Sequence, residues 1–396
     1  MLLDILKAMV QKEASDLFLK VGYPPAMRVH GRIETMESTE AMGRREMDQV
    51  FAEVAPALVR REFETRGEID VAYDAPGVAR FRVNIARQQG EIAMVMRHIR
   101  TQIQDFETLG LPNAPLQALA LKPRGLILVT GTAGSGKSTT LATMIEYVNQ
   151  RERKHVVTIE DPIEYVFQPK RCIFSQREIG FDTKDFHHAL RNSVRQNPDI
   201  VLIGEMRDQE TMDVALQAAE TGHLVLSTLH TVNATQTVER IIHFFPPHQH
   251  EMVRLQLSLV LQGIVSQRLI PRMDGTGRAP AVEILMATPF IRELLAEGKV
   301  RDIPRAMKDD TYFGSQTFLE SLKRLYQEER ISLQDALLAS DNPEEFKMEI
   351  KGIVKGSKIG DFDFELPAQN AKPAPGPARS SPLPENPFQK TKFGGK

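Results

Sequence analysis

The segment at residues 131–138, with the sequence GTAGSGKS, constrains this chain more than any other because it implies both a local fold and a class of ligand. It matches the phosphate-binding P-loop pattern at every position. An apolar run at residues 126–129 precedes it, and a helix-forming run at residues 139–148 follows it. The sequence therefore predicts a strand, a glycine-rich loop and a helix in that order, with a nucleotide bound at the loop.

The chemistry of this loop follows from its residue types. Glycines let successive backbone N–H groups point at one phosphate group, and the N-terminus of the next helix adds its dipole. We expect Lys137 to reach the β- and γ-phosphates of ATP and the Ser138 hydroxyl to bind Mg²⁺. The residues predicted to bind the nucleotide are Gly131, Thr132, Ala133, Gly134, Ser135, Gly136, Lys137, Ser138 and Thr139.

The surrounding pattern predicts a mixed α/β chain. Buried-type strands at 126–130, 156–159, 200–203 and 224–228 alternate with helices, which indicates a parallel sheet covered on both faces. Residues 1–100 instead favour a small α+β domain, with strands at 16–19, 27–29, 68–73, 79–86 and 91–98 in an antiparallel sheet and a helix at 44–66 interrupted near Pro56. A loop at 109–124 is the expected boundary. The pattern predicts that residues 251–341 are mainly helical, with a hairpin near 274–277. It also predicts that the proline-rich residues 367–396 are disordered.

Two acidic segments follow strands of the predicted parallel sheet. Glu160, Asp161 and Glu164 come just past one strand, where open α/β sheets bind ligands and where a carboxylate can deprotonate an attacking water. A solvated acidic turn is the alternative there. Glu205 ends the apolar strand 200–203, as the acid of a Walker B segment does, and is placed to act on Mg²⁺ directly or through water.

Two histidines flank the strand at 224–228. Their odd spacing puts His223 and His230 on opposite faces of a continuous strand, so that one ligand cannot contact both through one face. His230 lies at the carboxyl end, nearer the expected phosphate site, whereas a hydrogen-bonded structural role suits His223 better. Metal binding by these histidines is not expected, since no further His or Cys has suitable spacing.

Composition excludes several classes of protein. The 396 residues carry 50 Lys and Arg against 52 Asp and Glu, a balance that argues against a protein that coats nucleic acid. Cys172 is the single cysteine, so a disulfide framework is excluded and a reducing compartment is indicated. No signal peptide and no run of about 18 apolar residues occurs, which predicts a cytoplasmic chain without an integral membrane segment.

Four ordered motifs resemble those of the secretion-type ATPases. They are GTAGSGKST, TIEDPIEY, NPDIVLIGEMRD and TGHLVLSTLHT, which are similar to the Walker A, Asp-box, Walker B and His-box motifs of the type IV pilus retraction ATPases. Residues 15–19 and 77–84 also match the family. The similarity therefore covers nearly the whole chain, up to about residue 345. The resemblance implies a PAS-like domain at 1–105, a linker at 106–123, a RecA-like ATPase core at 124–270, a helical C-terminal region at 271–350 and a flexible tail at 351–396.

The resemblance also assigns roles to residues of this chain. It implies a hexameric ring in which arginines of the N-terminal domain, here Arg82 and Arg97, reach the phosphates, with Arg124 as a further candidate. From the sequence pattern alone these three would be solvated or sheet-face charges. The family's general base corresponds best to Glu164, with Glu160 as second choice. His230 and Glu205 join the expected catalytic set.

Within the retraction family the chain resembles PilU-type accessory motors more than PilT-type motors, because residues 290–297 keep only part of the PilT motif AIRNLIRE. The implied partners are copies of the same chain, a PilT-like ATPase and an inner-membrane platform protein of the PilC kind, at the inner face of the membrane. An alternative is a ring-forming adaptor whose own hydrolysis is dispensable. A nucleic-acid translocase fits poorly, since no basic stripe with interleaved aromatics occurs and Trp is absent.

Overall fold

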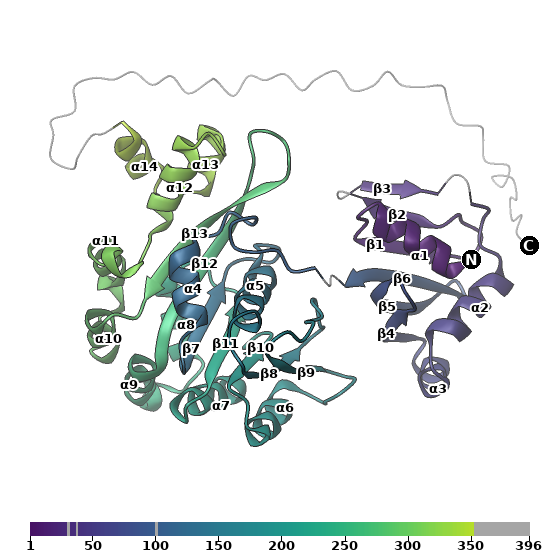
Figure 1. Cartoon of the computed structure of the whole chain (residues 1–396), viewed down its shortest axis with the longest axis horizontal. Helices are drawn as coiled ribbons and strands as arrows, with labels where there is room; N and C mark the ends of the chain where they lie inside the picture. The colour runs from purple at the N-terminus through teal and green to yellow at the C-terminus, as the bar shows by residue number, and fades with distance from the viewer. Residues whose placement is uncertain (30–31, 37–38, 100–101, 352–396) are drawn as a thin grey trace, which may run out of the picture. The chain divides into compact units, whose positions relative to one another are not determined.

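The computed structural model describes residues 1–29, 32–36, 39–99 and 102–351. The tail predicted at 351–396 therefore lies outside the described residues except for Lys351. Two β-sheets organise the described chain, each with its own hydrophobic core (Figure 1). No helix in the described part has the length and the apolar character needed to cross a membrane.

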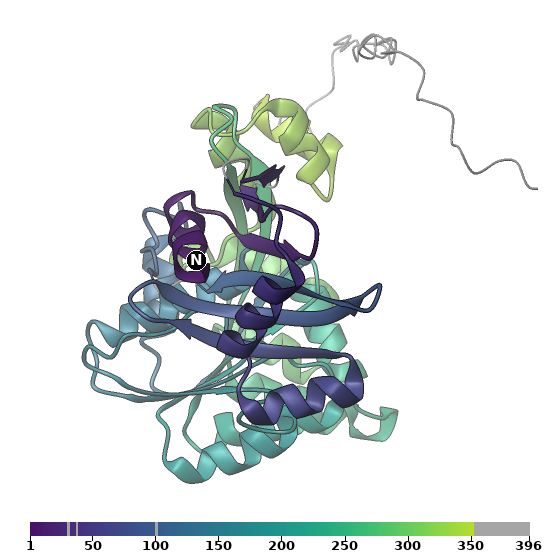
Figure 2. The same ribbon diagram turned by 90° about the vertical axis from the view of Figure 1, so that its right-hand side faces the viewer.

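The N-terminal sheet is antiparallel throughout, as predicted, with the order β3-β2-β1-β6-β5-β4. Three helices pack against one face of it and bury a single apolar core (Figures 1 and 2). The strands are β1 (Asp16–Lys20), β2 (Ala26–Val29), β3 (Arg32–Thr35), β4 (Glu68–Ala75), β5 (Ala79–Gln88) and β6 (Glu91–Ile99), and the helices are α1 (Leu2–Gln11), α2 (Arg44–Val54) and α3 (Ala57–Arg66). The break between α2 and α3 falls at Pro56, where it was expected.

The second sheet has the order β13-β12-β7-β11-β10-β8-β9, and all its neighbouring strands run parallel except β12 and β13. Its strands are β7 (Gly125–Thr130), β8 (His155–Glu160), β9 (Ile173–Glu178), β10 (Ile200–Ile203), β11 (Leu224–Leu229), β12 (Leu261–Pro271) and β13 (Arg278–Met286). The four predicted parallel strands are confirmed. The edge strand β9 was missed because its polar residues, QRE at the end, give no apolar run.

Helices cover both faces of this sheet, as the α/β rhythm predicted. On one face lie α4 (Asn113–Ala120) and α5 (Lys137–Asn149). The other face packs against α6 (Phe186–Ser193), α7 (Gln209–Glu220), α8 (Ala234–His243), α9 (His250–Val260), α10 (Pro289–Ala296) and α11 (Ile303–Asp309). Three further helices, α12 (Phe318–Gln327), α13 (Leu333–Ala339) and α14 (Pro343–Ile350), form a separate core with the distal part of the β12–β13 hairpin (Figure 1).

Two secondary-structure predictions are wrong. The expected loop at 109–124 contains α4, in which Pro115 occupies the first turn, where a backbone N–H has no partner within the helix, while Leu116 and Leu119 are buried. The region expected to be mainly helical contains the long strands β12 and β13, although the hairpin turn itself is confirmed. Both strands are buried on both faces, so their apolar runs lack the alternation that separates a strand from a helix.

The start of β7 depends on a glycine. Gly125 has φ +113°, and a Cβ at this position would lie 2.5 Å from the carbonyl oxygen of Val260. Both the backbone conformation and the close approach therefore exclude a side chain. Because β7 leads directly into the P-loop, this contact fixes where the loop begins.

We expect Gly125→Ala to lower the free energy of unfolding by at least about 2 kcal/mol, since it adds a backbone clash to left-handed strain. Gly275→Ala is the matched control, because Gly275 has φ +70° and nothing within 4 Å of its added Cβ. The control should lose only about 1 kcal/mol. Urea unfolding followed by circular dichroism measures both, and equal losses would contradict the assigned clash.

Candidate active site

The P-loop forms where β7 ends and α5 begins, and its backbone requires glycine. Gly131, Gly134 and Gly136 have φ values of +144°, +75° and +93°. A Cβ on Gly131 would lie 2.4 Å from Ser135 Oγ and 2.5 Å from the carbonyl oxygen of Gln267. The loop is thus wrapped tightly against its own turn and against β12. The predicted strand, loop and helix succeed one another in that order.

Lys137 is the first residue of α5, and its side chain turns back into the loop. Its Nζ donates hydrogen bonds to the carbonyl oxygens of Gly131 at 2.9 Å and Thr132 at 3.0 Å. Burial lowers the pKa of Lys137, while the carboxylates of Glu205 and Glu164 act in the opposite direction. A buried ammonium within a glycine-rich loop at the start of a helix suits the binding of nucleotide phosphates.

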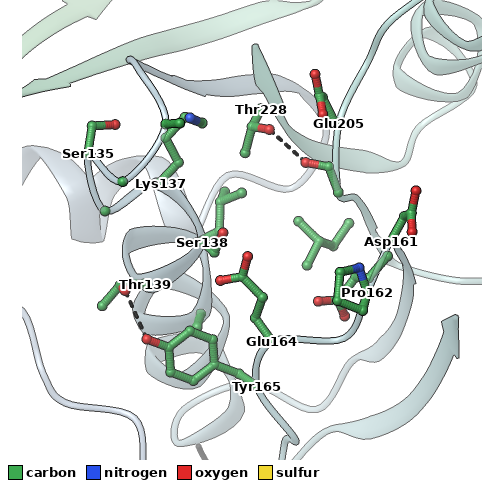
Figure 3. A pocket seen from close by; sticks show the side chains of 18 of the residues that line it. Ser135, Lys137, Ser138, Thr139, Asp161, Pro162, Glu164, Tyr165, Glu205 and Thr228 are labelled. Carbon is green, nitrogen blue, oxygen red and sulfur yellow. Dashed lines mark hydrogen bonds between the residues drawn. The ribbon is translucent and has the colours of Figure 1, made fainter. Parts of the chain in front are cut away.

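A pocket of about 440 Å³ opens beside the P-loop and collects most of the predicted site residues (Figure 3). It is lined by residues from the carboxyl ends of β8, β10 and β11, by the first turns of α5 and by part of the β12–β13 hairpin. Of the predicted residues, Ala133, Gly134, Ser135, Gly136, Lys137, Ser138, Thr139, Glu160, Glu164, Glu205 and His230 line it. The strands' parallel register is what brings these distant segments to one edge of the sheet.

Glu205 lies after β10 at the centre of a small charged cluster. Its Oε2 is 2.8 Å from a guanidinium nitrogen of Arg207, and its Oε1 is 3.3 Å from Nε2 of His230. The neighbouring strands are tied together at this point, because Thr228 Oγ1 donates to the carbonyl oxygen of Gly204 at 2.7 Å (Figure 3). The structure thus brings Glu205 and His230 together beside the P-loop.

The two glutamates of the segment after β8 lie in different environments. Glu160 is buried, accepts a hydrogen bond from Gln176 at 3.4 Å, and has its pKa raised to about 7, chiefly by burial. Glu164 is exposed to the pocket, and its carboxylate points toward Ser138 (Figure 3). A carboxylate near the Ser138 hydroxyl, the predicted Mg²⁺ ligand, is better placed to act on a water than one buried beside Gln176.

The two histidines lie beyond opposite ends of β11, and only His230, at the carboxyl end, lines the pocket. His223 does not line the pocket, and its Nδ1 lies 2.9 Å from the carbonyl oxygen of Ala218 and 3.2 Å from Thr221 Oγ1. These contacts suit a structural role.

One cluster of potential metal ligands lies elsewhere in the described residues. Asp185, His187 and His188 have ligand atoms within 4.8 Å of one another, but Asp185 already accepts a hydrogen bond from the His188 backbone N–H as the cap of α6.

Arg82 and Arg97 lie on the N-terminal sheet, opposite one another on β5 and β6. They share the face that turns away from the apolar core. Arg97 is 2.9 Å from the carboxylate of Asp16, which is 7% exposed, and Arg82 is 3.5 Å from Asp70. The acids hold the two guanidinium groups in place on an open sheet face. Arg124 is exposed, directly before β7.

Tyr165, Arg207 and Arg278 also line the pocket, although none of them was predicted as a site residue. Tyr165 donates to or accepts from Thr139 Oγ1 at 2.8 Å, and Arg278 of the β12–β13 hairpin donates to the carbonyl oxygen of Gly134 at 3.4 Å. Arg278 stands far along the chain from the P-loop and belongs to no recognised motif, so only the folded hairpin brings it there. Arg207 had a signal, because it lies two residues after Glu205.

The raised pKa of Glu160 predicts a pH-dependent penalty on stability. A carboxyl whose folded pKa exceeds its usual 4.5 stabilises the fold below pH 4.5, and this contribution is lost as pH rises to about 7. Glu160→Gln should therefore raise the free energy of unfolding by about 3 kcal/mol at pH 8 but by only about 1 kcal/mol at pH 5.5. Urea unfolding at both values tests this, with the exposed Glu164→Gln as control. A gain that is the same at both values would be inconsistent with a buried neutral Glu160.

Known proteins resemble this chain over most of its length. The family model described as Type II/IV secretion system protein matches residues 2–347. The type IV pilus ATPase PilU of Pseudomonas aeruginosa is 44% identical over 347 residues, which cover 88% of this chain and 90% of that protein. The PilT retraction ATPase of the same organism is 41% identical over 343 residues, covering 87% and 99%. The crystal structure of the pilus retraction motor PilT with bound ADP matches with a TM-score of 0.81 at 44% identity, covering 87% of this chain and 98% of the other. The chain therefore belongs to the type II/IV secretion protein family and, within it, to the PilT and PilU group of pilus retraction ATPases.

Proposed function

We propose that this chain hydrolyses ATP at the pocket beside the P-loop and uses the energy to retract type IV pili in twitching motility. The observation that carries the proposal is the convergence of Lys137, Glu164, Glu205 and His230 on one pocket of about 440 Å³. The relatives PilU and PilT, whose names describe a pilus ATPase and a retraction ATPase, support the same reaction and the same use of it.

The residues take distinct roles in this proposal. The loop N–H groups and Lys137 bind the phosphates of ATP. Ser138 and Glu205 hold Mg²⁺, which neutralises charge on the β- and γ-phosphates when it is bound. Glu164 orients and deprotonates the attacking water, because its carboxylate points toward Ser138 (Figure 3). His230 follows the next strand and lies 3.3 Å from Glu205, and we expect it to contact the γ-phosphate.

In this proposal, two arginines of the N-terminal sheet add positive charge that interacts with the ATP phosphates. Arg82 and Arg97 lie directly opposite one another on a sheet face, where Asp70 and Asp16 hold their guanidinium groups in place. We propose that Arg82 and Arg97 contact ATP phosphates in the assembled ring and stabilise the transition state. A positioned arginine contributes about 10³–10⁵ to turnover in such reactions.

The assembly and its partners are part of the same proposal. We propose a homo-hexamer with a PAS-like domain at 1–105, a linker at 106–123, a RecA-like core at 124–270, a C-terminal region at 271–350 and a flexible tail at 351–396. The ring would work as a PilU-like accessory motor beside a PilT-like ATPase, on a PilC-like platform protein at the cytoplasmic face of the inner membrane. Within one organism, Pseudomonas aeruginosa, the identity of 44% to PilU against 41% to PilT supports the accessory role.

The choice of general base can be tested with two glutamine variants. We expect Glu164→Gln to lower kcat by about 100-fold, because a positioned base contributes about 10²–10⁴. Glu160→Gln should change kcat by less than about threefold, since the Glu160 carboxyl is buried beside Gln176, whereas that of Glu164 is exposed to the pocket. Phosphate release by the purified protein measures both, with Lys137→Ala as the reference without activity. The opposite ranking would make Glu160 the base.

A complementation test in cells distinguishes an ATP-driven motor from a ring-forming adaptor whose own hydrolysis is dispensable. In a strain lacking the chromosomal gene, a Glu205→Ala copy should fail to restore pilus retraction, because Mg²⁺ binding and hydrolysis are lost while the ring is still made. Twitching zones and immunoblots of the variant provide the measurement, with an Arg272→Lys copy as the control that restores motility. Normal twitching by a Glu205→Ala protein that has no ATPase activity would instead establish a structural adaptor.

A further inference from the structure

The loop that carries His230 into the pocket is tied to distant elements by several contacts. It consists of residues 230–233 and joins β11 to α8. Thr231 is buried, and its hydroxyl lies 2.6 Å from that of Thr237 on α8. His230 itself is half exposed, and its contact in the pocket is Glu205. Its position relative to the phosphates therefore depends on what holds the loop and the first turn of α8.

Glu283 of β13 holds the start of α8. Its Oε1 accepts a hydrogen bond of 2.7 Å from the backbone N–H of Ala234, the first residue of that helix. Asn233 caps the same end by accepting from the Gln236 N–H at 2.9 Å. An acidic oxygen at a helix N-terminus satisfies an unpaired N–H and interacts favourably with the helix dipole. The helix therefore starts at a point fixed by the second strand of the hairpin.

Arg268 of β12 lies on the same face of the hairpin as Glu283, since Glu283 pairs with Ser266 across the strands. One guanidinium nitrogen donates to the carbonyl oxygen of Val232 in the His230 loop, at 3.5 Å. The same nitrogen lies 2.7 and 3.0 Å from the two carboxylate oxygens of Asp341. Arg268 thus contacts the His230 loop on one side and the segment between α13 and α14 on the other.

Two more contacts attach Arg268 to the C-terminal helices. It donates to the carbonyl oxygen of Ala339, the last residue of α13, where a cation complements the helix dipole. Its guanidinium carbon lies 3.9 Å from the ring centroid of Phe318 at the start of α12. The side chain is 21% exposed, so that it is held by contacts on several sides. An arginine in such a setting is not replaceable by lysine, which lacks the planar fork.

The neighbouring residue on β12 connects the same strand to the P-loop. Gln267 exchanges hydrogen bonds with Thr140 of α5 at 3.1 and 2.8 Å, and its carbonyl oxygen packs against Gly131. Alternation along the strand thus directs the Gln267 side chain to the first turn of α5, just after the phosphate-binding loop, and the Arg268 side chain to the His230 loop. One strand contacts both sides of the nucleotide site and the C-terminal helices.

We propose that Arg268 is a positioning residue that couples the nucleotide pocket to the C-terminal helices α12–α14. When ATP engages His230, the loop and the first turn of α8 shift, and Arg268 passes this change to Asp341 and the end of α13. The proposal rests on the proposed role of His230 at the phosphates. The position of the C-terminal helices α12–α14 would then depend on whether ATP is bound in the pocket.

The test compares two matched pairs of variants in the full-length chain. Arg268→Lys removes the guanidinium group that contacts Val232, Ala339 and Asp341 together, and Asp341→Asn removes the negative charge of the ion pair between β12 and the segment after α13. Arg272→Lys and Asp274→Asn make the same changes in the ion pair at the tip of the same hairpin, where Arg272 lies 2.7 Å from Asp274. Thermal unfolding establishes that all four variants are folded. Each is then assayed for ATPase kcat and KM, and for amide hydrogen exchange with and without a non-hydrolysable ATP analogue.

In the parent protein the analogue should slow exchange in residues 230–240 and also in residues 333–346. Arg268→Lys and Asp341→Asn should keep the first effect and lose the second, with kcat reduced about tenfold and KM for ATP within about twofold, as couplings of this kind produce. The tip variants should behave like the parent. A purely structural role would instead raise exchange equally in both nucleotide states.

Two results would overturn the proposal. One is a parent protein that hydrolyses ATP but shows no nucleotide-dependent exchange in residues 333–346. The other is an Arg268→Lys variant that retains both this response and the parent kcat. A parent protein that neither binds the analogue nor hydrolyses ATP would count against the proposed function itself, so the two failures are distinguishable.

Discussion

The parallel pairing of β7, β11, β10 and β8 is the constraint on which the rest of the structure depends. Val129 pairs with Thr228 and Ile203 with Ser227, so the strands end at nearly the same level. The P-loop, Glu205 and His230 each follow one of these strands directly. The site is therefore made of short extensions from a buried and rigid platform, which places its charged groups without requiring long ordered loops.

The same edge of the sheet sorts its carboxyl groups by burial. Glu160 is the last residue of β8, and the sheet and Gln176 enclose it, which favours its neutral form. Four residues later, beyond Pro162, Glu164 has left the sheet and faces the pocket as an exposed side chain. Glu205 is paired with Arg207 and His230. The three acids thus have different surroundings within one pocket, which supports the different roles proposed for them.

The hairpin β12–β13 joins this edge to the end of the chain. The β12 strand pairs with β7, and the carbonyl oxygen of Gln267 on β12 lies against Gly131 of the P-loop. The outer part of the hairpin shares a hydrophobic core with α12, α13 and α14. A strand that packs against both a nucleotide loop and a separate helical core is a mechanically direct link between them, because a packed strand moves as a unit.

What the sequence determined by itself were the features with a strong local signal. The P-loop pattern, the four parallel strands and the acids and histidine that follow them were all predictable, because each is a short motif beside an apolar run. The tertiary structure alone decided which glutamate is buried, since Glu160 and Glu164 share one motif and differ only in where β8 ends. It also decided the nature of residues 261–286, whose apolar runs suit a buried strand or a helix equally. Finally, it placed Arg268, Glu283 and Arg278, which become neighbours of the site only because the hairpin pairs with β7, and long-range pairing leaves no local trace in a sequence.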